Sequence, residues 1–146
     1  DQGSEIALIM IGGLNYYTGQ AYDMKEITKA GHAEGCMVGF DLAHGAGNLE
    51  LALHDWDVDF SVWCTYKYIN SGPGGIAGCF VHERHIASKD IPRFAGWWGH
   101  DKATRFLMDD TFVPIIGAEG WQMSNETVLS MAAALDHARF PEQVFV

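Results

Sequence analysis

The stretch that decides the fold is Cys36-Met37-Val38-Gly39-Phe40-Asp41, a short apolar run that ends on an acidic residue. A run of this length, entered through Gly35, is typical of a strand that is buried on both faces. Similar runs occupy residues 5–11, which stop at a pair of glycines, and residues 60–63. Three such runs in succession predict the core of a mainly parallel sheet.

The segments between these runs have helical or irregular patterns. Residues Ile27, Ala30 and Ala33 recur at helical spacing behind Asp23, a plausible N-cap, and Gly35 would end that helix. Short helices are expected over residues 49–54 and 82–88, and a longer one over residues 126–137, capped by Ser124 or Asn125. The order strand, helix, strand, helix, strand predicts an α/β fold with helices flanking the sheet.

A glycine-rich turn, Asn70-Ser71-Gly72-Pro73-Gly74-Gly75, follows the third strand. Such a turn reverses the chain, so residues 78–81 are expected to form an antiparallel fourth strand. Residues 92–113 are rich in aromatic side chains and glycine and show no periodicity. A long irregular loop of this kind is usually functional or lies at an interface.

Composition excludes several classes of partner. The net charge is −10, which argues against nucleic acid and anionic membrane surfaces, because both need clustered positive charge. No apolar run approaches the ~20 residues of a membrane-spanning helix. The three cysteines, Cys36, Cys64 and Cys79, lie in apolar runs and are expected to be reduced core residues of a cytoplasmic protein.

Polar residues follow two of the predicted strands. Asp41 ends one strand, His44 comes three residues later, and Lys67 lies just beyond the next strand. Since the carboxyl ends of parallel strands meet at one edge of a sheet, these groups are expected to face one small site. Pyridoxal phosphate needs such a pair, because its aldehyde bonds to a lysine amine and a carboxylate keeps its ring nitrogen protonated. Each residue alone is more often a cap, a structural hydrogen-bond partner or a surface lysine, so spacing does not name the cofactor.

A metal site is not expected. The segment His82-Glu83-Arg84-His85 places its histidines three residues apart, whereas the metalloprotease helix motif needs four. Cys79 belongs to a predicted strand, which makes a cluster with these histidines improbable.

Longer motifs resemble the kynureninases, in order and over nearly the whole chain. They are Tyr17-Thr18-Gly19-Gln20, Asp41-Leu42-Ala43-His44, Trp56-Asp57-Val58-Asp59-Phe60, Trp63-Cys64-Thr65-Tyr66-Lys67-Tyr68-Ile69-Asn70 with the glycine-rich turn, Gly96-Trp97-Trp98-Gly99-His100 and Ser124-Asn125. The segment around Lys67 is specific, whereas the Asp-x-x-His element also fits relatives in the same cofactor superfamily. The resemblance implies the large domain of an aspartate-aminotransferase-like fold.

The resemblance also implies roles for individual residues. Lys67 would hold pyridoxal 5'-phosphate as a Schiff base, Asp41 would pair with the pyridine nitrogen, and His44 would lie near the cofactor. Tyr66 would bind the phosphate and move protons. Trp97, near the cofactor phosphate, and Asn125, near the cofactor and the aromatic ring of the substrate, would come from a partner subunit. Ser124 would also bind the substrate. The family often has Ser where this chain has Gly12, so backbone N–H groups or water would replace one phosphate contact.

The implied reaction is hydrolysis of L-kynurenine or 3-hydroxykynurenine, giving anthranilate or 3-hydroxyanthranilate and L-alanine, in tryptophan catabolism and NAD biosynthesis. A homodimer with a shared active site is implied. Residues 1–124 would belong to the cofactor-binding domain and residues 125–146 would lead toward a smaller one. The chain is expected to be an internal part of a longer protein and inactive alone. Two alternatives remain: another enzyme of the superfamily, such as a cysteine desulfurase or an aminotransferase, and a truncated, non-catalytic interaction module.

Overall fold

The computed structural model describes residues 2–86 and 91–139, which pack as two compact units. The first unit contains Asp1–Phe80 and Thr127–Val146, and the second contains Val81–Glu126. The boundary predicted between residues 124 and 125 concerns domains of a longer protein and stays a prediction.

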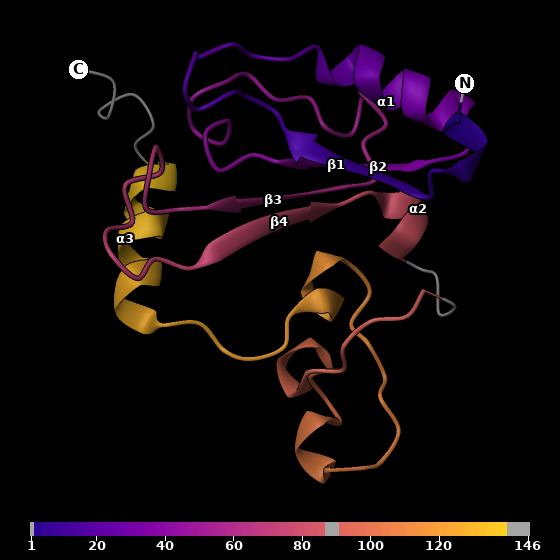
Figure 1. Ribbon diagram of the computed structural model, residues 1–146. Helices are drawn as coiled ribbons and strands as arrows, with labels where there is room; N and C mark the ends of the chain where they lie inside the picture. The colour runs from indigo at the N-terminus through magenta and orange to yellow at the C-terminus, as the bar shows by residue number, and fades with distance from the viewer. Residues whose placement is uncertain (1, 87–90, 140–146) are drawn as a thin grey trace. The chain divides into compact units, whose positions relative to one another are not determined.

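The first unit is built on a four-stranded sheet with the order β1-β2-β3-β4 (Figure 1). Strands β1 (Leu8–Gly12), β2 (Met37–Asp41) and β3 (Phe60–Cys64) are parallel. Strand β4 (Ala77–Val81) runs in the opposite direction to β3 (Figure 1). The predicted α/β class, the parallel strands and the antiparallel fourth strand are confirmed. The first strand is shorter than expected, because Gly3–Glu5 form a short 3₁₀ helix, η1.

The reversal between β3 and β4 follows the glycine-rich turn. Gly72 and Gly74 adopt φ angles of 79° and 76°, which glycine reaches without steric cost. The hydroxyls of Thr65 and Ser71 lie 2.6 Å apart, and the Ser71 N–H donates to the Thr65 carbonyl. These bonds close the loop that presents Lys67.

Helix α1 (Met24–Ala33) covers one face of β1 and β2, as the sequence predicts. The Asp23 side chain caps it by accepting the Glu26 N–H at 3.0 Å, and Gly35 leaves it with a φ of 80°. Gly31 faces the sheet, and a Cβ atom there would lie 2.5 Å from Val38 Cγ2. The helix therefore sits on the sheet as closely as a glycine allows.

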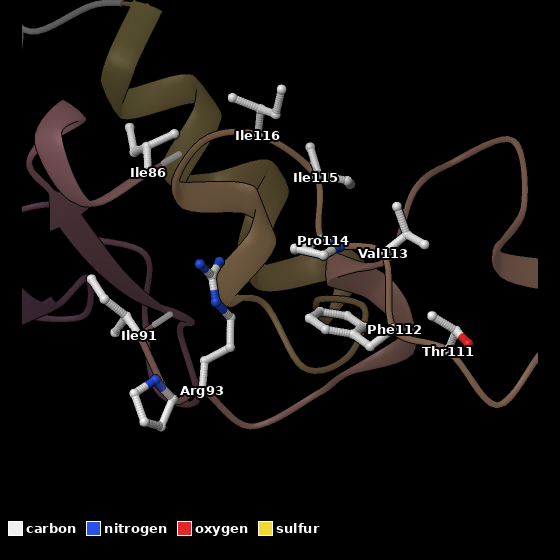
Figure 2. Close-up of a pocket in the computed structure, with 10 residues that line it drawn as sticks. Ile86, Ile91, Arg93, Thr111, Phe112, Val113, Pro114, Ile115 and Ile116 are labelled. Atoms are coloured by element: carbon white, nitrogen blue, oxygen red, sulfur yellow. The ribbon is translucent and has the colours of Figure 1, made fainter. Parts of the chain in front are cut away.

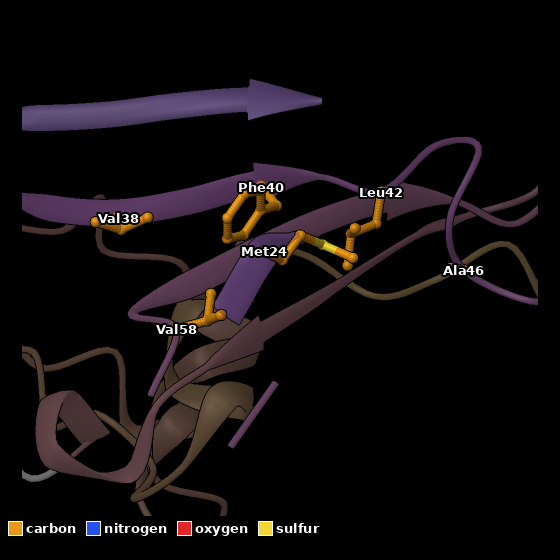
Figure 3. Packing of buried hydrophobic residues seen from close by; sticks show 6 residues of the cluster. All are labelled: Met24, Val38, Phe40, Leu42, Ala46 and Val58. Atoms are coloured by element: carbon orange, nitrogen blue, oxygen red, sulfur yellow. The ribbon is translucent and has the colours of Figure 1, made fainter. Parts of the chain in front are cut away.

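The core lies between α1 and this face of the sheet (Figure 3). It consists of six buried apolar residues: Met24, Val38, Phe40, Leu42, Ala46 and Val58. Side chains that alternate with these point to the opposite face, where Leu8 is 51% exposed and Met10 is 48% exposed. Parallel sheets are normally covered on both faces. Here the apolar side chains of the second face are partly exposed to solvent within the described residues.

Two helix predictions need correction. Residues 49–54 form an irregular segment that enters a turn at residue 53 instead of a helix, because Leu49, Leu51 and Leu53 alternate and pack against the core. Helix α3 (Val128–Arg139) begins at Val128, so Ser124 and Asn125 lie before its cap position. Thr127 precedes the helix, and its hydroxyl lies 2.5 Å from that of Ser130.

The second unit is largely irregular, as predicted for residues 92–113. It contains helix α2 (Glu83–Ile86) and the 3₁₀ helices η2 (Trp97–Gly99), η3 (Arg105–Leu107) and η4 (Ala118–Trp121). The expected helix over residues 82–88 extends partly outside the described residues. Arg105 is buried and donates to the carbonyls of Trp98 and His100 at 2.9 and 3.2 Å. These bonds tie η3 to η2 and the residue that follows it.

The cysteines are free, and they differ in environment. Cys36 is buried, as expected, whereas Cys79 on β4 is exposed and is not the core residue that was predicted. Neighbouring atoms nevertheless desolvate its thiol enough to raise its pKa above the ordinary value. Within residues 2–86 and 91–139, no helix has the length and apolar character needed to cross a membrane.

Candidate active site

The carboxyl ends of the parallel strands form one edge of the sheet, and several of the predicted site residues lie there. In the sheet register, Gly12 at the end of β1 pairs with Asp41 at the end of β2. Asp41 in turn pairs with Val62 in β3, and Lys67 follows three residues after β3 ends. The three arrowheads point to the same side in Figure 1. The structure thus places Gly12, Asp41 and the Lys67 loop at the same edge of the sheet. The sequence predicts this edge for Asp41 and Lys67, and the roles of all three residues at a cofactor stay predictions.

Lys67 and His44 are in direct contact. The Nζ atom of Lys67 lies 2.9 Å from Nε2 of His44, and both side chains are partly buried. An ammonium group can only donate, so in this arrangement Nε2 accepts and the ring proton of His44 lies on Nδ1. The contact brings together two residues that are 23 positions apart in the sequence.

Two tyrosines flank the His44 ring, and the sequence reasoning had not singled out either of them. The rings of Tyr16 and Tyr68 each lie 6.0 Å from it, at interplanar angles of 33° and 66°. Tyr16 comes from the loop after β1, where the Asn15 side chain accepts the N–H groups of Tyr17 and Thr18. These loop residues carry no periodic signal, although Tyr16 immediately precedes the motif that begins at Tyr17.

Asp41 presents an exposed carboxylate at this edge. Its Oδ1 atom accepts the N–H of Ala43 at 2.8 Å, which stabilises the turn that leads to His44. The carboxylate is therefore oriented by its own turn, and the same turn brings His44 back to Lys67. A Cβ atom on neighbouring Gly12 would lie 3.3 Å from the Leu14 carbonyl oxygen, a close contact for any larger residue.

Tyr66 lies beside Lys67, with its ring centroid 5.9 Å from Nζ. It is 52% exposed and so remains accessible to a ligand. At this distance a weak attraction between the cation and the ring is expected. This sheet edge thus carries a carboxylate at the end of β2, and an amine, an imidazole and a phenol on the loops that follow β2 and β3.

The remaining predicted residues belong to the second unit. Trp97 begins η2, where its ring packs 5.0 Å from that of Trp98 and 5.8 Å from that of Phe106. Ser124 donates to the Asn125 side chain at 3.4 Å, and both residues are exposed. Their proposed roles at the cofactor and the substrate stay predictions.

A cavity of about 660 Å³ lies within the second unit (Figure 2). Apolar side chains such as Phe112 and Ile115 line most of it, and Arg93 lies 4.4 Å from the centre of the Trp121 ring. None of the predicted site residues lines this cavity. Within the described ranges, no three His, Cys, Asp or Glu side chains are grouped to hold a metal ion.

Comparison with known proteins agrees with this geometry. Residues 3–96 match the aminotransferase class-V family. The chain is 66% identical over 132 residues to a kynureninase of Koribacter versatilis and 62% identical over 133 residues to one of Flavobacterium psychrophilum. A kynureninase of Nematostella vectensis is 56% identical over 139 residues. These alignments cover 90%, 91% and 93% of this chain, which spans only 31%, 31% and 30% of the relatives' length.

Solved structures share the fold. A cysteine desulfurase from Escherichia coli superposes with a TM-score of 0.69 at 19% identity, covering 93% of this chain and 33% of that one. A ureidoglycine-glyoxylate aminotransferase from Bacillus subtilis gives 0.60, also at 19% identity, covering 91% of this chain and 33% of that one. At this level of identity the likeness concerns the fold alone.

Proposed function

Since this chain belongs to the aminotransferase class-V family, we propose that the whole protein is a pyridoxal-phosphate enzyme that hydrolyses the side chain of L-kynurenine. The products would be anthranilate and L-alanine. The observation that carries the proposal is identity of 56–66% to kynureninases over about 90% of the chain, together with Lys67 and Asp41 at one sheet edge.

The residues at this edge fit the cofactor. An amine that bonds to an aldehyde and a carboxylate that faces a cationic ring are the two groups that pyridoxal phosphate requires. The cofactor supplies an electron sink for the carbon next to the substrate amine. Lys67 would hold it covalently, and Asp41 would keep its ring nitrogen protonated. Tyr66 would bind phosphate and move protons near Lys67.

The alternatives have weaker support. The cysteine desulfurases and the aminotransferase among the solved structures resemble the chain at 19–20% identity, far below the kynureninases. A non-catalytic module would also fit exposed aromatic residues such as Phe94 and Phe106, so the test must separate binding from catalysis.

The test uses the full-length protein with pyridoxal phosphate. Borohydride reduction followed by peptide mass mapping is expected to give a pyridoxyl adduct on Lys67, and fluorescence is expected to report anthranilate formed from L-kynurenine. Lys67→Arg should abolish both signals. Lys29→Arg is the matched control, because the Lys29 side chain is 76% exposed on α1 and pairs with Glu26 of the same helix at 3.6 Å. An adduct on another lysine, or sulfide or a keto acid as product, would refute the assignment.

Further aspects of this proposal need separate measurements. Rates with L-kynurenine and 3-hydroxykynurenine decide the substrate. We propose a cytoplasmic homodimer with a shared active site, acting in tryptophan catabolism and NAD biosynthesis. Light scattering of the full-length protein checks the dimer, and mixing Lys67→Arg with Asn125→Ala subunits checks the sharing. Recovery of activity in the mixed dimers is expected if Asn125 acts across the interface.

A further inference from the structure

We infer that His44 carries protons for Lys67 while the lysine amine forms its covalent bond to a cofactor aldehyde. The inference rests on the proposed function, and it assigns to His44 a step that precedes the hydrolysis itself. It starts from the contact of 2.9 Å between Lys67 Nζ and His44 Nε2. A general base must lie within about 2.6–3.2 Å of the group whose proton it takes, and His44 meets this condition.

The surroundings hold the imidazole in that position. The rings of Tyr16, from the loop after β1, and Tyr68, next to Lys67, each lie 6.0 Å from the His44 ring. The His44 backbone is fixed as well, because its carbonyl accepts from the Asn48 side chain at 3.0 Å. An imidazole confined in this way keeps Nε2 on the lysine amine and lets Nδ1 keep its own proton.

The chemistry of the step balances with one imidazole. Lys67 first loses one ammonium proton to solvent. The Nζ lone pair then adds to the aldehyde carbon, and His44 moves one N–H proton to the former carbonyl oxygen. When the C–O bond breaks, the second N–H proton follows by the same route. The carbonyl oxygen leaves as water, a C=N bond remains, and His44 ends in its starting form.

Other titratable groups near Lys67 are less well placed. The Asp41 carboxylate accepts the Ala43 N–H, and the proposed function assigns it to the cofactor ring. Tyr66 faces Nζ with its ring, whose centroid lies 5.9 Å away. The His44 imidazole makes a direct polar contact with Nζ, and a neutral imidazole accepts at one nitrogen and donates from the other, which suits a proton carrier.

The experiment measures cofactor loading instead of turnover. Pyridoxal phosphate is added to the cofactor-free full-length protein at pH 7, and the growth of yellow absorbance gives the loading rate. Borohydride trapping with peptide mapping confirms that the adduct is on Lys67. We expect His44→Ala to load about 10²-fold more slowly, which is the usual size of a general acid–base contribution. Added imidazole should restore much of the rate in this variant and have little effect on the wild type.

Two tyrosines of one loop provide a matched pair. Tyr16 touches the His44 ring and is 78% exposed, whereas Tyr17 is 88% exposed and makes no ring contact with His44. Tyr16→Leu is expected to slow loading about three- to tenfold, the size expected for one aromatic pair. Tyr17→Leu should load at the wild-type rate.

The outcomes distinguish a failure of the proton-carrier role of His44 from a failure of the proposed function. Wild-type loading at Lys67 with an equally fast His44→Ala would overturn the proton-carrier role and leave the proposed function intact. Slow loading that imidazole does not restore, in both His44→Ala and His44→Gln, would assign His44 a structural role and also overturn the inference. If the wild type forms no adduct on Lys67, the proposed function itself fails.

Discussion

In the proposed function, single residues at the sheet edge would decide the chemistry, and Asp41 illustrates this best. A carboxylate about 4 Å from a cationic ring nitrogen gains about 4 kcal/mol at an effective dielectric near 20. Asn at the same position keeps the shape and loses the charge. If Asp41 pairs with the ring as proposed, the identity of one atom would control whether the ring nitrogen stays protonated.

We predict that Asp41→Asn lowers kcat/KM of the full-length protein toward L-kynurenine by about 10³-fold, because the ring loses its counterion. The absorbance of the bound cofactor should change with it. Asp55→Asn is the control, since that side chain is 84% exposed and should leave both readings unchanged. A variant of Asp41 with near wild-type kcat/KM would rule out its pairing with the ring.

A buried aspartate at the other end of the strands has a structural role. Asp59 is 2% exposed, accepts the Val38 N–H at 2.7 Å and lies 2.8 Å from His32 Nε2. It ties α1 to β2 through the start of β3. Its loss would deprive a buried N–H of its acceptor.

Asp59→Ala should accordingly lower the free energy of unfolding by about 1–3 kcal/mol, the usual cost of an unsatisfied buried polar group. Urea denaturation of the full-length protein measures the loss. Asp55→Ala, on the surface, is expected to stay within about 0.5 kcal/mol of the wild type. Equal stability of the two variants would contradict this role for Asp59.

At the scale of elements, helix α1 and the sheet are fitted to each other at Gly31. Alanine is the better helix former by about 1 kcal/mol, so propensity favours Gly31→Ala. Packing opposes it, because the added Cβ would lie 2.5 Å from Val38 Cγ2 and 3.0 Å from Ile9 Cδ1. Val38 is fully buried and β-branched, which leaves it little freedom to move.

Packing should decide the sign at this position. Overpacking a core costs typically about 1–3 kcal/mol, so Gly31→Ala is expected to destabilise the protein despite the gain in helix propensity. Thermal or urea unfolding measures the change. Lys25→Ala, on the exposed side of the same helix, should be neutral within about 0.5 kcal/mol. A stabilised Gly31→Ala would show that α1 can move away from the sheet.

At the scale of the molecule, the notable feature is the exposed apolar face of the sheet, on the side opposite α1. Leu8, Met10, Met37 and Val62 project from this face and are 37–51% exposed. Parallel sheets bury both faces in complete proteins. The chain spans about 31% of the length of its kynureninase relatives, and in a protein of their length other segments would be available to cover this face.

We predict that the 146-residue chain alone binds the dye ANS strongly, because this apolar face is open, whereas the full-length protein binds it weakly. ANS fluorescence at equal molar concentration makes the comparison. Met10→Lys should reduce the signal of the short chain more than Tyr17→Lys, which lies in a loop. Equal dye binding by the short chain and the full-length protein would contradict the prediction.

By itself the sequence determined the local elements and the family. Apolar runs such as residues 36–40, the cap at Asp23 and the turn at Gly72 act within a few residues, so they can be recognised without knowledge of the fold. The same locality explains the error at residues 49–54, where spacing alone did not distinguish a helix from a looped segment that buries alternate leucines.

Only the tertiary structure decided which side chains meet. The pairing of Lys67 with His44, the two tyrosines around that imidazole and the open sheet face all depend on the strand register and on the paths of two loops. Register and loop path follow from the packing of α1 and the core against β2, which joins residues far apart in the chain. This packing depends on contacts between distant segments. The sequence pattern could therefore predict that Asp41, His44 and Lys67 share one edge of the sheet, but not the direct contact between Lys67 and His44, the two tyrosine neighbours or the open face.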